Sequence, residues 1–251
     1  MTLSVIVITR NEAAVIARCL ESVAWADEII VMDAASTDGT PDIARKFNAK
    51  VNATADWPGF GTQKNRALAL ATGDWVLSID ADEWVTPELR AEIQRAVGAP
   101  GDYSAFRIPR LSSYCGRFMR HSGWWPDYVT RIFRRSAARF SDDLVHERLI
   151  VDGTVGALHE SLMHEAIVDL ADALEKMNAY STAGAAMQFG RGKTASLTAA
   201  VVHGVWTFIR TYFLRGGILD GREGFMLAVS NAEGAYYRYL KLMLLGKKRH
   251  G

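Results

Sequence analysis

Two aspartates flank one small residue at the end of an apolar segment, as Asp80-Ala81-Asp82 after residues 75–79. Carboxylate oxygens suit Mg²⁺ and Mn²⁺, which a protein holds through one or two carboxylates while substrate phosphates fill other positions. Acidic residues also gather at strand ends and helix N-termini, where Glu83 and Glu88 would favour the dipole of a following helix. The triplet alone therefore fits a divalent-metal site and a purely structural role equally well.

Two other apolar segments also run into polar clusters. Residues 4–8 are followed by Thr9, Arg10, Asn11 and Glu12, and residues 28–32 by Asp33 and the polar stretch 36–39. In parallel α/β sheets the ligand binds beyond the carboxyl ends of the strands. Three such clusters at one edge support a site more strongly than any single motif does.

Strand and helix patterns alternate through the first hundred residues, which predicts a three-layer α/β fold with a mostly parallel central sheet. Shorter strands are expected at residues 103–111, 128–134 and 147–151, then helices at 168–189, 195–215 and 224–245. Residues 190–193 are the best candidate linker. We therefore predict a catalytic domain over 1–190 and an amphipathic, basic helical region over 191–251.

Composition excludes several classes of protein. The 251 residues include only two cysteines, too few for a disulfide scaffold or a cysteine-based zinc cluster. The net charge of +1 divides unequally, because residues 191–251 hold ten basic and three acidic side chains, whereas residues 1–190 hold 19 and 25. No G-x-G-x-x-G follows the first strand and no G-x-x-x-x-G-K-[ST] occurs, which disfavours dinucleotide and P-loop sites.

Several of these segments together resemble family 2 glycosyltransferases of the GT-A fold. The matching segments are residues 4–12, 30–33 with 36–40, 64–65 and 73–83, and the resemblance covers nearly the whole chain. The later segments 146–147, 206–214 and 219–221 resemble the lipopolysaccharide core β-glucosyltransferases of the WaaE/KdtX type. The resemblance implies an inverting, metal-dependent hexosyltransferase. It would move glucose from UDP-glucose onto a lipid-linked glycan, with the lipopolysaccharide inner core as first choice. The alternatives are another lipid-linked or cell-wall glycan, or a non-catalytic protein that binds a sugar nucleotide.

The resemblance assigns the donor pocket to residues at the strand ends. Asp33 would accept a hydrogen bond from a uracil N–H, and Lys64 would reach the diphosphate as a point charge. Asp80 would face the ribose or the metal, and Asp82 would ligate Mn²⁺ or Mg²⁺. The predicted nucleotide-sugar-binding residues are Thr9, Asn11, Glu12, Asp33, Lys64, Asp80 and Ala81.

The resemblance also implies a carboxylate base that deprotonates the acceptor hydroxyl. Glu147 is the first candidate and Asp143 is its competitor. A histidine often faces the metal in this fold, which indicates His164 as a second ligand, with His159 as a nearby rival.

Predicted acceptor contacts come from aromatic and basic residues beyond the first sheet. Trp124 and Trp125 could stack on sugar rings, and Arg131 could bind phosphate oxygens. His146 is assigned to the acceptor, or to a structural bond with a backbone carbonyl.

The apolar C-terminal stretch includes His203 and Arg210, which makes a bilayer-spanning helix doubtful. Its aromatic and basic residues instead predict a helix lying on an anionic membrane surface. Alternatively, these helices pack on the catalytic domain and the basic tail is solvated. The resemblance argues against nucleic acid as a partner. The protein is thus expected in the cytoplasm, peripheral at the inner face of a bacterial cytoplasmic membrane.

Overall fold

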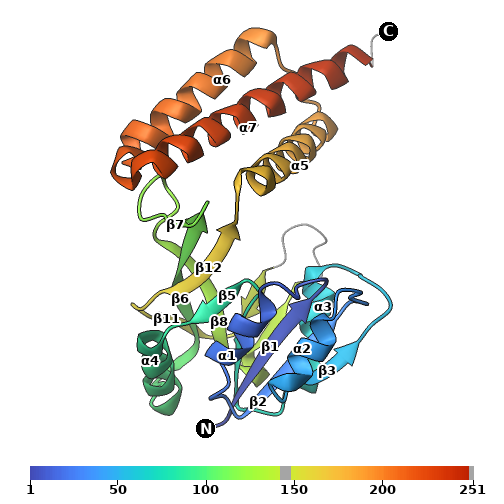
Figure 1. The fold of residues 1–251 in the computed structure, drawn as a ribbon, viewed down its shortest axis with the longest axis vertical. Helices are drawn as coiled ribbons and strands as arrows, with labels where there is room; N and C mark the ends of the chain where they lie inside the picture. Colours follow the sequence, from blue (N-terminus) through green and yellow to red (C-terminus); the bar gives the residue numbers. More distant parts are fainter. Residues whose placement is uncertain (142–147, 249–251) are drawn as a thin grey trace. The chain divides into compact units, whose positions relative to one another are not determined.

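The computed structural model describes residues 1–141 and 148–248 (Figure 1). The predicted residues Asp143, His146 and Glu147 lie outside the described residues. Contacts divide the chain into two compact units, one formed by residues 1–110 and 127–164 and the other by residues 111–126 and 165–251. Contacts thus group residues 165–190 with the C-terminal helices. The boundary after residue 190 stays a prediction.

The first half of the first unit alternates strands and helices. In chain order it contains β1 (Leu3–Thr9), α1 (Ile16–Ser22), β2 (Glu28–Asp33), α2 (Thr40–Lys46), β3 (Lys50–Ala53), α3 (Phe60–Leu70), β4 (Trp75–Ser78), β5 (Glu83–Val85) and α4 (Pro87–Gly98). Strands β3, β2, β1 and β4 are neighbours in that order and pair in parallel. All seven residues of β1 are buried, as expected for a strand covered on both faces.

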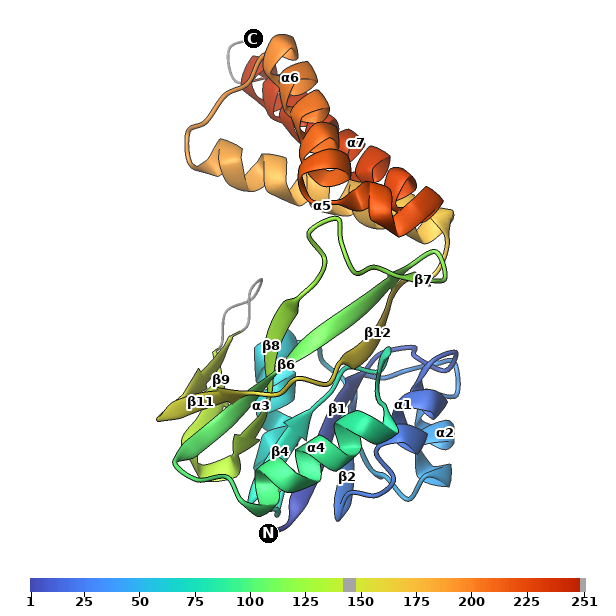
Figure 2. The same ribbon diagram turned by 90° about the vertical axis from the view of Figure 1, so that its left-hand side faces the viewer.

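Two hydrophobic clusters cover the two faces of this sheet. Val5 and Val7 of β1 belong to one cluster with residues of α1, α2 and α4. Ile6 and Ile8 belong to a second cluster with residues of α3. Figure 2 shows α3 on one side of β1 and α1 and α2 on the other. The alternation of side chains along β1 therefore produces the predicted three layers.

The amino ends of the strands are held together by Glu28. Its carboxylate accepts hydrogen bonds from Ser4, from Lys50 Nζ at 2.8 Å, and from the Thr72 backbone nitrogen at 2.6 Å. Burial acts to raise the pKa of Glu28, but hydrogen bonds from Lys50, Ser4 and Thr72 outweigh it and lower the pKa to about 2. Gly73 follows, and its nitrogen donates to Ser4 Oγ at 2.8 Å. Any Cβ at residue 73 would meet the backbone of β1.

The second half of the sheet contains antiparallel pairs. It comprises β6 (Tyr103–Tyr114), β7 (Arg117–Phe118), β8 (Asp127–Arg134), β11 (Thr154–Ala157) and β12 (Leu162–Ile167). After a 3-10 turn (Arg135–Ala137), β9 (Ala138–Phe140) and β10 (Leu149–Val151) pair as a separate two-stranded sheet. Strand β8 pairs antiparallel with β4 and β6, and β12 pairs antiparallel with β5. The predicted mostly parallel sheet is thus parallel in its first half. Pairing with β5 brings β12 next to the Asp80–Glu83 turn.

Three long helices dominate the second unit: α5 (Leu170–Gly190), α6 (Leu197–Ile209) and α7 (Gly221–Lys248). A π-helical turn (Arg210–Leu214) and a 3-10 turn (Gly217–Asp220) join α6 to α7. Lys241 of α7 donates to Asn178, Ser181 and Thr182 of α5, at 2.7 Å to 3.1 Å. His203 of α6 stacks on Tyr239 of α7 at 3.9 Å between ring centres. Of the helices described, none is both long and apolar enough to cross a membrane.

Candidate functional site

The carboxyl ends of β1 and β2 are joined by the Asp33 carboxylate. Its Oδ1 accepts from Thr9 Oγ1 at 2.9 Å and from Ser36 Oγ at 2.6 Å, and its Oδ2 accepts from the Ser36 nitrogen at 2.9 Å. Asp33 and Thr9 are each only 1% exposed. These hydrogen bonds connect the carboxyl ends of β1 and β2. Direct contact of Asp33 or Thr9 with a nucleotide stays a prediction.

Asn11 and Glu12 lie in the loop that follows β1. Asn11 has a φ of 58°, in the left-handed region that asparagine tolerates better than most residues, and its Oδ1 accepts from the Thr37 nitrogen at 2.9 Å. The Asn11 nitrogen donates to Ser36 Oγ, and the Glu12 nitrogen to Thr40 Oγ1, each at 2.8 Å. The polar stretch 36–40 therefore fixes the loop that follows β1, and Asn11 is exposed on it.

The Asp80-Ala81-Asp82 triplet forms a turn between β4 and β5. The Glu83 nitrogen donates to the Asp80 carbonyl at 3.0 Å, and the Asp80 nitrogen donates to Glu83 Oε2, also at 3.0 Å. Ala81 is 5% exposed and packs in the hydrophobic cluster, which explains why the middle residue is small. The Asp80 and Asp82 side chains keep 32% and 37% exposure. The turn thus buries its alanine and leaves both carboxylates accessible.

An ion network surrounds Asp80. Its Oδ1 lies 3.2 Å from Lys64 Nζ, and its Oδ2 contacts Arg131, whose Nη2 also lies 2.6 Å from Glu83 Oε1. Arg110 lies 3.4 Å from Glu83. Burial acts to raise the pKa of Asp80, but the charges of Arg131 and Lys64 outweigh it and hold that pKa well below its usual range. Asp80 is therefore ionised at neutral pH.

Sequence reasoning missed two members of this network. The sequence places Glu83 in the acidic cluster after a strand and near a helix N-terminus, whereas in the structure it lies in β5, is 0% exposed and accepts a hydrogen bond from Arg131. Arg110, near the end of β6, connects Glu83 to Asp127. Arg131 is 7% exposed and lies between the carboxylates of Asp80 and Glu83, and its predicted contact with the acceptor stays a prediction. The acidic run Asp80–Glu83 was the available signal, but only pairing of β8 with β4 brings Arg131 to it.

Helix α3 positions Lys64. The Asn65 side chain both donates to and accepts from the Phe140 backbone, at 2.9 Å in each case, which fixes α3 against β9. Gln63 is fully buried and donates to Thr54 Oγ1 at 2.7 Å. Lys64 between them is only 4% exposed. A lysine this buried is positioned by the fold and is not a solvated surface residue.

A cavity of about 460 Å³ opens beside Asp80. Among the residues that the structure describes, four cationic side chains and one carboxylate face it, together with apolar and hydroxyl groups. Its lining comprises Lys64, Asp80, Arg110, Val129, Thr130, Arg131, Phe140, Arg148 and Leu149. Guanidinium and ammonium groups around a pocket are suited to bind phosphate oxygens.

Asp82 lies beside His164, whose Nε2 is 3.3 Å from Asp82 Oδ2. This proximity follows from β12, where His164 pairs directly opposite Glu83 of β5. The rival His159 is exposed, and its backbone nitrogen donates to Glu92 of α4. Within residues 1–141 and 148–248, no group of three or more His, Cys, Asp or Glu side chains forms a complete metal site. Asp82 and His164 could supply two ligands, which suits an ion that takes its others from a diphosphate and water.

The two predicted tryptophans belong to the other unit. Trp124 meets Tyr114 edge-on with ring centres 6.0 Å apart, and packs against a cluster with Met119 and Leu227. The Trp125 ring lies 5.7 Å from the Arg120 guanidinium. A sugar contact by either tryptophan stays a prediction.

Comparison with known proteins gives consistent results. Residues 4–150 match the model of glycosyl transferase family 2. An uncharacterized glycosyltransferase of Rickettsia felis is 31% identical, with 97% of this chain and 89% of that protein covered. The lipopolysaccharide core biosynthesis glycosyltransferase LpsC of Rhizobium meliloti is 30% identical, with 96% and 89% covered.

One solved structure is also similar over the full length. Residues 1–349 of TarS from S. aureus, in complex with UDP, superpose with a TM-score of 0.51 at 18% identity, covering 99% of this chain and 92% of that one. At this identity the likeness concerns the fold, and it agrees with the layers and sheet described above. By its family match and its relatives, the chain belongs to glycosyl transferase family 2, and its fold is GT-A.

Proposed function

We propose that this protein is an inverting, metal-dependent hexosyltransferase that uses UDP-glucose and acts on a lipid-linked glycan, with the lipopolysaccharide inner core as the first acceptor to test. The observation that carries the proposal is the Asp80–Asp82 turn at the carboxyl edge of the parallel strands. Buried Lys64 faces one aspartate and His164 faces the other. A purely structural turn would not require two partly exposed carboxylates with such partners.

The donor would place its diphosphate between the cationic cavity and the Asp82–His164 pair. Lys64 and Arg148 line the cavity and are suited to hold phosphate oxygens. A divalent ion bound to Asp82 and His164 would neutralise charge that develops on the departing diphosphate. Asp80 is already paired with Lys64 and Arg131, so we assign it to orienting these cations or the ribose. Asp82 is therefore the first ligand to test.

The proposed acceptor chemistry rests on a relative and on the helical unit. LpsC of Rhizobium meliloti is named for lipopolysaccharide core biosynthesis. Helix α6 and the turns after it expose a series of large apolar side chains: Val201, Val202, Val205, Trp206, Phe213, Leu214, Ile218 and Leu219. Arg210 and Arg215 are exposed on the same segment. This combination favours docking on an anionic membrane surface, where a lipid-linked acceptor would be located.

Donor binding and transfer can be tested separately. Asp82→Asn should abolish the Mn²⁺-dependent part of UDP binding in calorimetry, since it removes a charged ligand. Glu88→Gln, which alters an exposed carboxylate of α4, serves as the matched control. If Asp82→Asn binds UDP with undiminished metal dependence, the ligand assignment is wrong.

The proposed base is tested by transfer assays with UDP-glucose. Glu147→Gln should retain UDP binding and lose transfer. If Asp143→Asn is the inactive variant instead, the base is Asp143. UDP binding with no turnover on any lipid-linked or cell-wall glycan would favour the non-catalytic alternative.

A further inference from the structure

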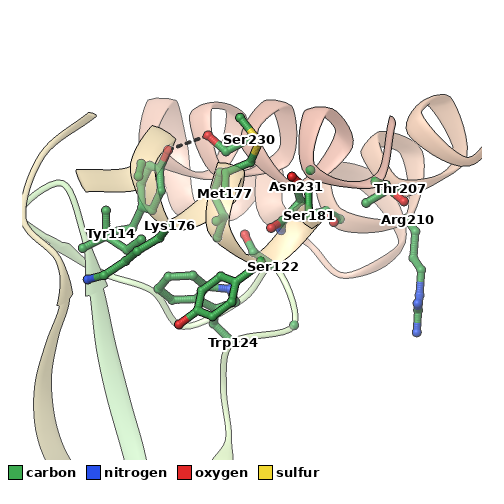
Figure 3. A pocket seen from close by; sticks show the side chains of 18 of the residues that line it. Tyr114, Ser122, Trp124, Lys176, Met177, Ser181, Thr207, Arg210, Ser230 and Asn231 are labelled. Atoms are coloured by element: carbon green, nitrogen blue, oxygen red, sulfur yellow. Dashed lines mark hydrogen bonds between the residues drawn. The ribbon is translucent and has the colours of Figure 1, made fainter. Parts of the chain in front are cut away.

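The second unit contains a cavity of about 540 Å³, within the size range of small-molecule sites. Helices α5, α6 and α7 and the loop at residues 122–124 form its walls (Figure 3). Of the residues that the structure describes, four cationic side chains line it: Lys176, Arg210, Arg215 and Arg238. No aspartate or glutamate is among the described residues that line it. The cavity is therefore strongly cationic.

These cations are unequally neutralised by the protein. Lys176 pairs with Asp172 at 3.0 Å and donates to the Ala166 carbonyl at 2.7 Å. Within the described part of the chain, no carboxylate forms an ion pair with Arg210, Arg215 or Arg238. The Nε of Arg238 is buried and has no hydrogen-bond partner among the residues described. Because buried donors in folded proteins are nearly always paired, this orphan N–H indicates an acceptor supplied by a ligand.

The walls of the cavity are held firmly in place. Asp220 is 2% exposed and accepts from the His121 nitrogen and from Ser122 Oγ, each at 3.0 Å, which fixes the loop that carries Ser122. The hydroxyl oxygens of Tyr114 and Ser230 lie 2.8 Å apart and form a hydrogen bond, drawn as a dashed line in Figure 3. The cavity is thus a built feature of the helical unit.

The chemistry of the lining identifies the class of ligand. Guanidinium forks match phosphate oxygens in geometry and charge. The remaining lining combines apolar and aromatic side chains, among them Trp124, Met177 and Leu227, with hydroxyl and amide groups. We propose that this cavity is a binding site for a phosphate group, either on an amphipathic phosphate ester or free in solution. A lipid headgroup and free phosphate share this chemistry. The inference does not depend on the proposed transfer reaction.

Calorimetric titration of the full chain tests the site with three probes: dihexanoyl phosphatidic acid below its micellar concentration, inorganic phosphate, and uncharged dihexanoyl glycerol. We expect phosphatidic acid to bind and dihexanoyl glycerol not to. Arg238→Gln should weaken phosphatidic acid binding by about tenfold or more, as the loss of a charged hydrogen bond predicts. Arg191→Gln removes the same charge from the exposed turn after α5 and should change affinity by less than about twofold.

The probes also distinguish the two sources of phosphate. Tighter binding of phosphatidic acid than of inorganic phosphate assigns the site to a lipid headgroup, and equal binding assigns it to free phosphate. Arg215→Gln alters an exposed rim residue, so it serves as a second variant if Arg238→Gln fails to fold. The proposal is overturned if neither phosphate probe binds, if dihexanoyl glycerol binds as tightly as phosphatidic acid, or if a folded arginine variant keeps wild-type affinity.

Discussion

Replacing Glu83 with glutamine tests the ion network that supports the Asp80 turn. The side chain is 0% exposed and lies 2.6 Å from Arg131 and 3.4 Å from Arg110. The charges of Lys64, Asp80, Glu83 and Arg131 sum to zero, so the substitution leaves one positive charge uncompensated at a buried position. Glutamine has the same shape, so packing should change little.

The decrease in the free energy of unfolding expected for Glu83→Gln can be estimated from these contacts. Removing one partner of a buried ion pair costs about 3–5 kcal/mol. Because Arg131 retains Asp80 as a partner, we expect a smaller decrease of about 2–3 kcal/mol in the free energy of unfolding. Equilibrium urea unfolding measures this loss, and the exposed Glu88→Gln should cost less than about 1 kcal/mol.

A double-mutant cycle separates the ion pair from general damage. Arg131→Met alone should also destabilise, because it leaves Asp80 and Glu83 facing one another without their shared cation. The combined variant should then lose less than the sum of the two, with a coupling of about 1–3 kcal/mol. An unfolding free energy of Glu83→Gln equal to that of wild type, or a coupling near zero, would refute this account of the network.

Three further perturbations follow from the fold. Gly73→Ala places a Cβ 2.8 Å from a backbone nitrogen of β1, so we expect a loss of about 1–3 kcal/mol in urea unfolding; an unchanged midpoint would contradict the steric argument. The pKa of Glu28 is lowered to about 2 in the folded protein. The ionised carboxylate therefore contributes to the free energy of unfolding above pH 4.5, and this contribution is lost as the pH falls through 2. Glu28→Gln should therefore cost up to about 3 kcal/mol at pH 7 and much less at pH 2, and a pH-independent difference would count against it. The double variant Val202→Asp and Trp206→Asp should weaken binding to anionic vesicles, measured by flotation, by about tenfold or more. The control Val168→Asp, at another exposed valine, should leave this binding unchanged. Equal effects of the two variants would argue against docking through α6.

Much of the parallel half of the sheet, and of the residues that follow its strands, could be predicted from local sequence pattern. The apolar segments before Thr9, Asp33 and Asp80 did form strands, and all three strands are parallel neighbours. Period-2 burial and helix spacing are local signals, and the right-handed β-α-β connection then places the carboxyl ends at one edge. His164 was selected over His159 only by resemblance, and the pairing of β12 with β5 brings it to Asp82.

Contacts between segments far apart in the chain could not be predicted from the sequence. The sequence by itself determined the family, the parallel half of the sheet and the acidic turn, because these depend on local patterns and short motifs. Only the tertiary structure decided that Glu83 and Arg131 are buried partners, since antiparallel pairing of β8 with β4 brings together residues 48 apart. It also decided that Asp33 connects two strand ends and that arginines from α7 and from the turn between α6 and α7 line one cavity. Such arrangements depend on which distant strands pair and on how helices pack, and local propensity and periodicity do not specify these long-range contacts.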